Sequence, residues 1–101
     1  MKEVTIYELK EMMDNQSDFQ LIDVREEFEY ESSNLGGLLI PLGSVLDRQD
    51  EISKTKTVVV HCRSGARSAT AIRELESKFG FTNLQNLKGG IMAWESAFGK
   101  S

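Results

Sequence analysis

The chain has 101 residues, a formal net charge of −4 at pH 7, 40% hydrophobic residues and 28% charged residues. This composition is ordinary for a soluble globular protein, and its acidic balance argues against nucleic acid or an anionic membrane as a partner. One cysteine and one histidine exclude an internal disulfide and a zinc site built from cysteine and histidine. Since the N-terminus has no apolar signal segment and no apolar run could span a bilayer, we expect residues 1–101 to form a single cytoplasmic domain. No large apolar stripe is left unassigned, so we expect a monomer.

The first half of the chain predicts helices and strands in alternation. Thr5 and Glu8 have the spacing of a capping box, and apolar residues follow at helical intervals, which predicts a short first helix. The apolar-rich run at 19–24 predicts a strand, and the acidic segment 25–31 predicts one or two exposed helical turns. A short buried strand over 38–41 ends at the only proline.

The second half continues this alternation. The predicted elements are, in order, a polar helix over 43–52, a buried valine strand at 58–60, a helix that opens near Arg67 or Ser68 and ends at Gly80, a strand over 82–87 and a last helix after 89–90. Strands that alternate with helices are typical of a parallel sheet covered by helices on both faces. Ligands of such sheets bind beyond the carboxyl ends of the strands, and Cys62 stands at one of these ends.

The loop after the valine strand carries the clearest chemical signal. Cys62 ends the strand, and a short loop with two arginines and Gly65 leads into the next helix. Such a loop directs its backbone amides and the positive end of the helix dipole at the cysteine, and Gly65 is free to take a positive φ. This setting lowers a thiol pKa and stabilises an anion bonded to the sulfur.

Other polar residues near the loop are expected to have structural roles. His61 and the cysteine are adjacent on a strand and face opposite sides, so His61 is a poor general base and is expected to be packed or hydrogen-bonded within the fold. Asp23 and Arg25 are expected to form a brace at a strand end, and Ser68 is expected to cap the helix. The acidic run 26–31 is expected to be a solvated face.

Three segments together resemble the rhodanese family of single-domain sulfurtransferases. They are LIDVREEFEY at 21–30, the Cys-Arg-Ser-Gly-Ala-Arg-Ser loop at 62–68 and LKGGIMAW at 87–94. Residues 38–43 are also similar to the rhodanese domains fused to sulfur-activating adenylyltransferases, whereas residues 32–37 lack the Gly-His pair that many members have. The resemblance implies a rhodanese-like three-layer α/β fold, with a central, mostly parallel sheet covered by helices on both faces.

By this resemblance, Cys62 is the catalytic nucleophile that accepts a sulfane sulfur and becomes a persulfide. The implied substrate-binding residues are Arg63, Ser64, Gly65, Ala66 and Arg67. The two arginines suit the sulfonate of thiosulfate. The implied activity moves sulfur from a small-molecule donor such as thiosulfate to a thiophilic acceptor, which is cyanide in vitro. No metal or organic cofactor is implied, and the expected macromolecular partner is a sulfur-acceptor protein.

Two other functions use a similar loop. A persulfide carrier or redox-sensing module needs the same reactive cysteine but leaves the chemistry to a partner protein. A cysteine phosphatase or arsenate reductase shares the thiolate and the arginine, but its signature places five residues between them. Only four residues separate Cys62 from Arg67, and this tighter loop favours a single sulfur or selenium atom over a tetrahedral oxyanion.

Overall fold

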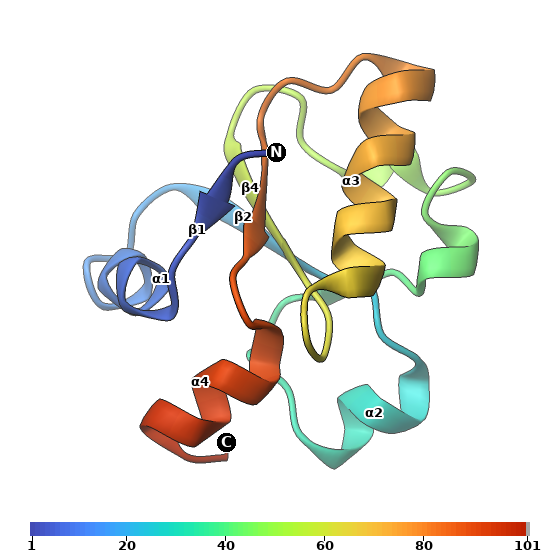
Figure 1. Cartoon of the computed structure of the whole chain (residues 1–101). Coiled ribbons are helices and arrows are strands. Elements are labelled where there is room, and N and C mark those ends of the chain that lie inside the picture. Colours follow the sequence, from blue (N-terminus) through green and yellow to red (C-terminus); the bar gives the residue numbers. More distant parts are fainter. Residues whose placement is uncertain (101) are drawn as a thin grey trace.

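A computed structural model describes residues 1–100 and shows a five-stranded sheet between helices (Figure 1). The strands are β1 (Glu3–Val4), β2 (Phe19–Asp23), β3 (Leu38–Leu39), β4 (Thr57–His61) and β5 (Leu84–Leu87). The helices are α1 (Ile6–Asp14), α2 (Glu27–Ser32), α3 (Ala66–Phe79) and α4 (Gly90–Phe98). The sheet order is β1-β5-β4-β2-β3 and every neighbouring pair is parallel, so the expected α/β fold is confirmed.

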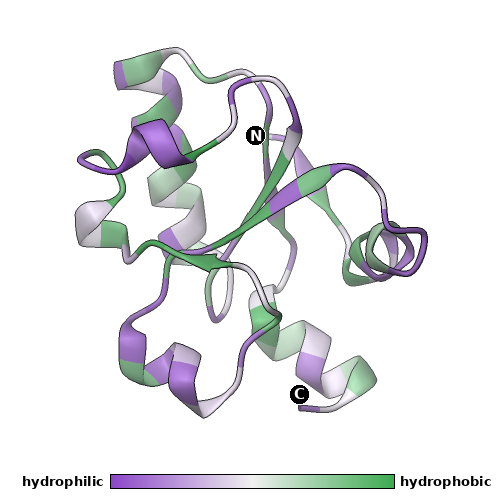
Figure 2. Ribbon diagram, turned by 180° about the vertical axis from the view of Figure 1, so that it is seen from behind, coloured by the Kyte–Doolittle hydropathy of each residue, from purple (hydrophilic) through white to green (hydrophobic). Residues whose placement is uncertain are grey.

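The central strand β4 divides the core into two layers. Side chains alternate along a strand, so Val58, Val60 and Cys62 face one side of the sheet and Val59 faces the other. The first group packs with the buried residues of α3, and Val59 packs with those of α1 and β5. Figure 2 shows hydrophobic residues along the sheet and mostly hydrophilic residues along α2.

The helices form where capping and apolar spacing support them. Thr5 and Glu8 make the expected capping box at the start of α1, and Gly80 ends α3 in a left-handed conformation. Ile72 and Leu75 of α3 are completely buried against the sheet. Within residues 1–100, no helix combines the length and apolar character needed to cross a membrane.

Two parts of the backbone differ from the sequence-based expectation. The segment 43–52 contains two short 3₁₀ helices, Leu42–Ser44 and Gln49–Glu51, instead of one polar helix. This segment includes glycine, serine and aspartate, which favour turns over helix interiors, and it bends so that Val45 and Ile52 are buried in the core. The edge strand β1 was not expected, because two residues are too few to show an alternating pattern.

Candidate active site at the carboxyl end of β4

Cys62 directly follows β4, and its sulfur lies inside the loop that leads to α3. The residue is only 1% exposed. The backbone N–H of Gly65 donates to the Sγ atom at 3.1 Å and that of Ser68 donates at 3.4 Å. Two amides from the loop and the first turn of α3 therefore point at the sulfur, as the sequence predicted.

The curl of this loop depends on Gly65. Its φ of +110° is a conformation that residues with a side chain rarely adopt, and it forms the N-cap of α3. The helix begins at Ala66, one or two residues earlier than expected, so its N-terminus lies close to the sulfur. Arg63, Ser64 and Ala66 are exposed on the outside of the loop.

The surroundings of the sulfur favour its anionic form. Burial alone would raise the pKa of Cys62, but hydrogen bonds from Ser68, Gly65 and Ser64 outweigh it and place the pKa below its ordinary value of 9.0. These donors also suit the negative outer sulfur of a persulfide. These hydrogen bonds therefore offset the cost of burying a negative charge on the sulfur of Cys62.

Ser68 and Asn86 form a buried polar pair beside the sulfur. The Ser68 hydroxyl is 3.4 Å from Sγ of Cys62 and donates to Oδ1 of Asn86 at 2.6 Å. Nδ2 of Asn86 donates to the carbonyl of Gly65 at 3.1 Å. The expected capping role of Ser68 is wrong, because no side chain caps α3. Sequence analysis missed Asn86, which only its polar character in a buried strand could have indicated.

The first turn of α4 is hydrogen-bonded to the backbone that directly follows β4. The N–H of Ile91 donates to the carbonyl of Cys62 at 2.9 Å, and the N–H of Met92 donates to that of Arg63 at 3.0 Å. These contacts require a close approach at Gly90, where a Cβ atom would overlap the backbone of Cys62 and Arg63. The Gly-Gly pair at 89–90 permits this contact, which the sequence analysis did not predict.

Arg67 is held in an ion pair with α2. Its guanidinium donates to both carboxylate oxygens of Glu29, at 2.7 and 2.9 Å. This guanidinium holds the pKa of Glu29 at about 2, well below its ordinary value of 4.5. Glu29 also accepts from the N–H of Glu26 at the start of α2. The expectation of a purely solvated acidic face is therefore wrong for Glu29, which fixes Arg67 beside the loop.

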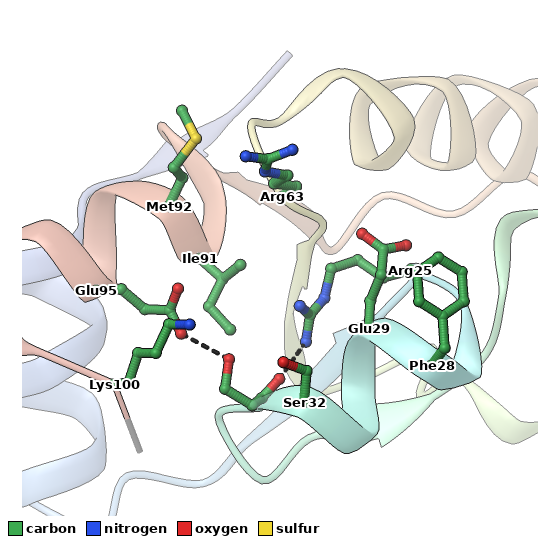
Figure 3. Close-up of a pocket in the computed structure, with 10 residues that line it drawn as sticks. Arg25, Phe28, Glu29, Ser32, Arg63, Ile91, Met92, Glu95 and Lys100 are labelled. Carbon is green, nitrogen blue, oxygen red and sulfur yellow. Dashed lines mark hydrogen bonds between the residues drawn. The ribbon is translucent and has the colours of Figure 1, made fainter.

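Arg63 lines a pocket of about 440 Å³ that lies between the loop, α2 and α4. Figure 3 shows Ile91 and Met92 of α4 on one side of this pocket and Phe28 and Glu29 of α2 on the other. Among residues 1–100, the guanidinium of Arg63 makes no hydrogen bond or ion pair. Its charge is therefore available to an anion that enters beside the loop.

The expected brace between Asp23 and Arg25 is confirmed. The buried guanidinium of Arg25 donates to the Asp23 carboxylate at 2.8 Å and to the carbonyl of Ser33 at 2.8 Å. Ser33 in turn donates to Glu95 of α4 at 2.6 Å. This chain of contacts, drawn in part in Figure 3, ties the end of β2 to both helices that flank the pocket.

His61 is completely buried on the side of the sheet opposite Cys62. Both ring nitrogens lack a hydrogen-bond partner among residues 1–100, and Nε2 lies 3.7 Å from Oδ2 of Asp23. The expectation that His61 is packed in the fold is confirmed. Burial outweighs the attraction of Asp23 and lowers the pKa of His61 below 6.5.

The free energy of unfolding should therefore decrease as the pH falls below about 6.5, the ordinary pKa of histidine. The unfolded chain takes up a proton there, whereas folded His61 stays neutral until the pH reaches its lower pKa. We expect urea titrations between neutral pH and about pH 5 to show this loss and His61→Gln to remove it. His61 is the only histidine, so an unchanged pH dependence in this variant would contradict the assignment.

Comparison with known proteins agrees with this geometry. Residues 5–97 match the family model described as "Rhodanese-like domain". A sulfurtransferase of Allochromatium vinosum is 34% identical over 95 residues, which cover 93% of this chain and 88% of that protein. The "Putative sulfur carrier protein YrkF" of Bacillus subtilis is 33% identical over 91% of this chain, which spans only 50% of YrkF. A rhodanese-like domain protein from Staphylococcus aureus is 30% identical, with a TM-score of 0.84 over 93% of this chain and 91% of that one. The chain belongs to the rhodanese family.

Proposed function

We propose that the protein is a sulfurtransferase that carries sulfane sulfur on Cys62. The observation that carries the proposal is the pair of backbone amides, from Gly65 and Ser68, that point at Sγ inside the loop. The sulfurtransferase of A. vinosum among its relatives supports sulfur transfer in general. The proposed donor is thiosulfate, and the proposed acceptors are cyanide in vitro and a sulfur-acceptor protein.

The proposed reaction has two displacement steps on sulfur. In the first, the Cys62 thiolate attacks the outer sulfur of thiosulfate, a new S–S bond forms, and sulfite leaves with the electron pair of the old bond. In the second, a nucleophile such as cyanide attacks the outer sulfur of the persulfide and regenerates the thiolate, giving thiocyanate. Both steps begin or end with an anion on Cys62, which the loop amides stabilise.

The two arginines contribute differently to donor binding. Arg63 is exposed and unpaired among residues 1–100, so it is proposed to bind the sulfonate directly. Arg67 uses its two terminal nitrogens on Glu29 and is proposed to act mainly by its position and charge. The remaining loop residues, Ser64, Gly65 and Ala66, supply backbone to the proposed site.

Replacing Arg63 by glutamine should raise the KM for thiosulfate about 10-fold to 100-fold, because a charge-assisted hydrogen bond is lost. Steady-state kinetics with thiosulfate and cyanide would measure this effect. Arg73→Gln is the matched control. Arg73 is exposed on α3, so this substitution removes the same charge from the protein surface but outside the loop. An equal rise of KM in both variants would show that only net charge matters.

Intact-mass spectrometry tests the proposed function directly. After incubation with thiosulfate the protein should gain the mass of one sulfur atom, and cyanide should remove it. No gain with thiosulfate or with any other sulfane-sulfur donor would overturn the proposal. A stable gain of one sulfur atom, together with negligible turnover of thiosulfate and cyanide, would favour the second candidate, a sulfur carrier. The similarity to YrkF supports this candidate.

A further inference from the structure

We infer that Asn86 is a positioning residue that competes with the sulfur of Cys62 for the single hydroxyl proton of Ser68. The inference rests on the proposed function only in assuming that Cys62 reacts as a thiolate. It concerns three buried side chains: Cys62 is 1% exposed, Ser68 0% and Asn86 5%.

The orientation of the Asn86 amide is fixed by its neighbours. The carbonyl of Gly65 is only an acceptor, so the nitrogen end of the amide must face it, at 3.1 Å. The oxygen end then faces Ser68, and the contact of 2.6 Å requires the hydroxyl to donate. The proton of Ser68 is therefore committed to Asn86 in this arrangement.

The hydrogen bond from Ser68 to Asn86 determines whether the Ser68 hydroxyl accepts from or donates to the sulfur of Cys62. With its proton on Asn86, the Ser68 oxygen presents a lone pair to Sγ at 3.4 Å, and a neutral Cys62 thiol donates its S–H to that oxygen. When Cys62 ionises, the sulfur has no proton to give and needs a donor instead. The hydroxyl turns to the sulfur anion, and Oδ1 of Asn86 loses its buried partner.

Asn86 therefore makes the thiolate less favourable than Ser68 alone would make it, while the Gly65 and Ser68 amides favour it in either state. When the persulfide forms, the negative charge moves to the outer sulfur and Sγ becomes neutral, so the hydroxyl returns to Asn86. The pair thus responds to the charge on Sγ at each step of sulfur transfer.

A double-mutant cycle on the pKa of Cys62 tests the inference. The ultraviolet absorbance of the thiolate reports this pKa without requiring a reagent to reach the buried sulfur, and Cys62 is the only cysteine. Asn86→Ala should lower the pKa more in the Ser68 background than in the Ser68→Ala background, by about half a pH unit to one pH unit. Loosening of the Gly65 contact is common to both backgrounds and cancels.

Neighbouring charges also cancel in this cycle. Arg63 of the loop, Arg67 with its partner Glu29 of α2, and neutral His61 of β4 are the same in all four proteins. Equal effects of Asn86→Ala in the two backgrounds, or a coupling of opposite sign, would overturn the inference. Failure of sulfur loading with a pKa coupling still present would overturn the proposed function and leave this inference standing.

Two further measurements keep the inference testable if Asn86→Ala does not fold. Asn86→Leu has a similar shape without the acceptor and gives the same cycle. Infrared spectroscopy of the unmodified protein at a pH below the pKa of Cys62 should show a hydrogen-bonded S–H stretch that moves to the free position in Ser68→Ala. A free S–H band in the unmodified protein would show that the thiol does not donate to Ser68.

Discussion

Replacing Cys62 with serine is expected to abolish sulfur loading and transfer completely. A serine hydroxyl has a far higher pKa than the Cys62 thiol and is not ionised at neutral pH, so the attack on the donor sulfur loses its nucleophile. Intact-mass spectrometry should show no gain with thiosulfate, and thiocyanate formation should fall to the uncatalysed rate. Loading or turnover in this variant would remove Cys62 from the mechanism.

The loss of activity in Cys62→Ser can be assigned to the missing thiol, because the substitution is nearly isosteric. The Gly65 and Ser68 amides remain available to the serine oxygen, so the free energy of unfolding should change by only about 1 kcal/mol. Ser64→Ala is the matched loop control, because Ser64 is exposed and its proposed contribution is its backbone. This control should load sulfur like the unmodified protein.

Replacing Gly90 with alanine is expected to destabilise the fold by about 3 kcal/mol or more. The added Cβ would overlap the carbonyl of Arg63 and stand 2.7 Å from that of Cys62, and a φ of +61° is itself unfavourable for alanine. Relief of this overlap moves α4 away from β4 and breaks the bonds from its first turn to the two carbonyls. Urea unfolding would measure the loss of stability.

The matched control is Gly43→Ala. A Cβ at Gly43 has no other atom within 4 Å, and its φ is not in the left-handed region, so the free energy of unfolding should change by about 0.5 kcal/mol or less. Equal stability of the two variants would mean that the contact between α4 and the end of β4 is dispensable. In Gly90→Ala molecules that remain folded, sulfur loading should also slow, because the strand end beneath Cys62 has shifted.

Local patterns explain how much of the fold and of the site could be predicted. The valine run, the Thr5 capping box and the glycine at position 65 each act within a few residues, so sequence alone indicates β4, α1 and the turn of the loop. The reactive setting of Cys62 follows from the same short segment. The three-layer arrangement of these elements and the expected chemistry of Cys62 came from the resemblance to the rhodanese family.

The parts that sequence did not predict depend on contacts between distant residues. Arg67 and Glu29 are 38 residues apart, and Ser68 and Asn86 are 18 apart, so no spacing rule connects them. Ser68 was expected to cap the helix, but α3 begins at Ala66 with Gly65 as its N-cap, and the Ser68 hydroxyl contacts the sulfur of Cys62 and Asn86 of β5 instead. Tertiary packing thus overrode the local preference.

The near-complete burial of Cys62 affects how accessible its sulfur is before and after the proposed loading. A residue that is 1% exposed offers oxidants and bulky electrophiles little to attack, so the resting thiol is shielded while it waits for a donor. In the proposed persulfide, the sulfur atom to be delivered would lie about 2 Å beyond Sγ, the length of an S–S bond. In the proposed cycle, the outer sulfur of the persulfide is therefore expected to be more accessible to an acceptor than the sulfur of the resting thiol.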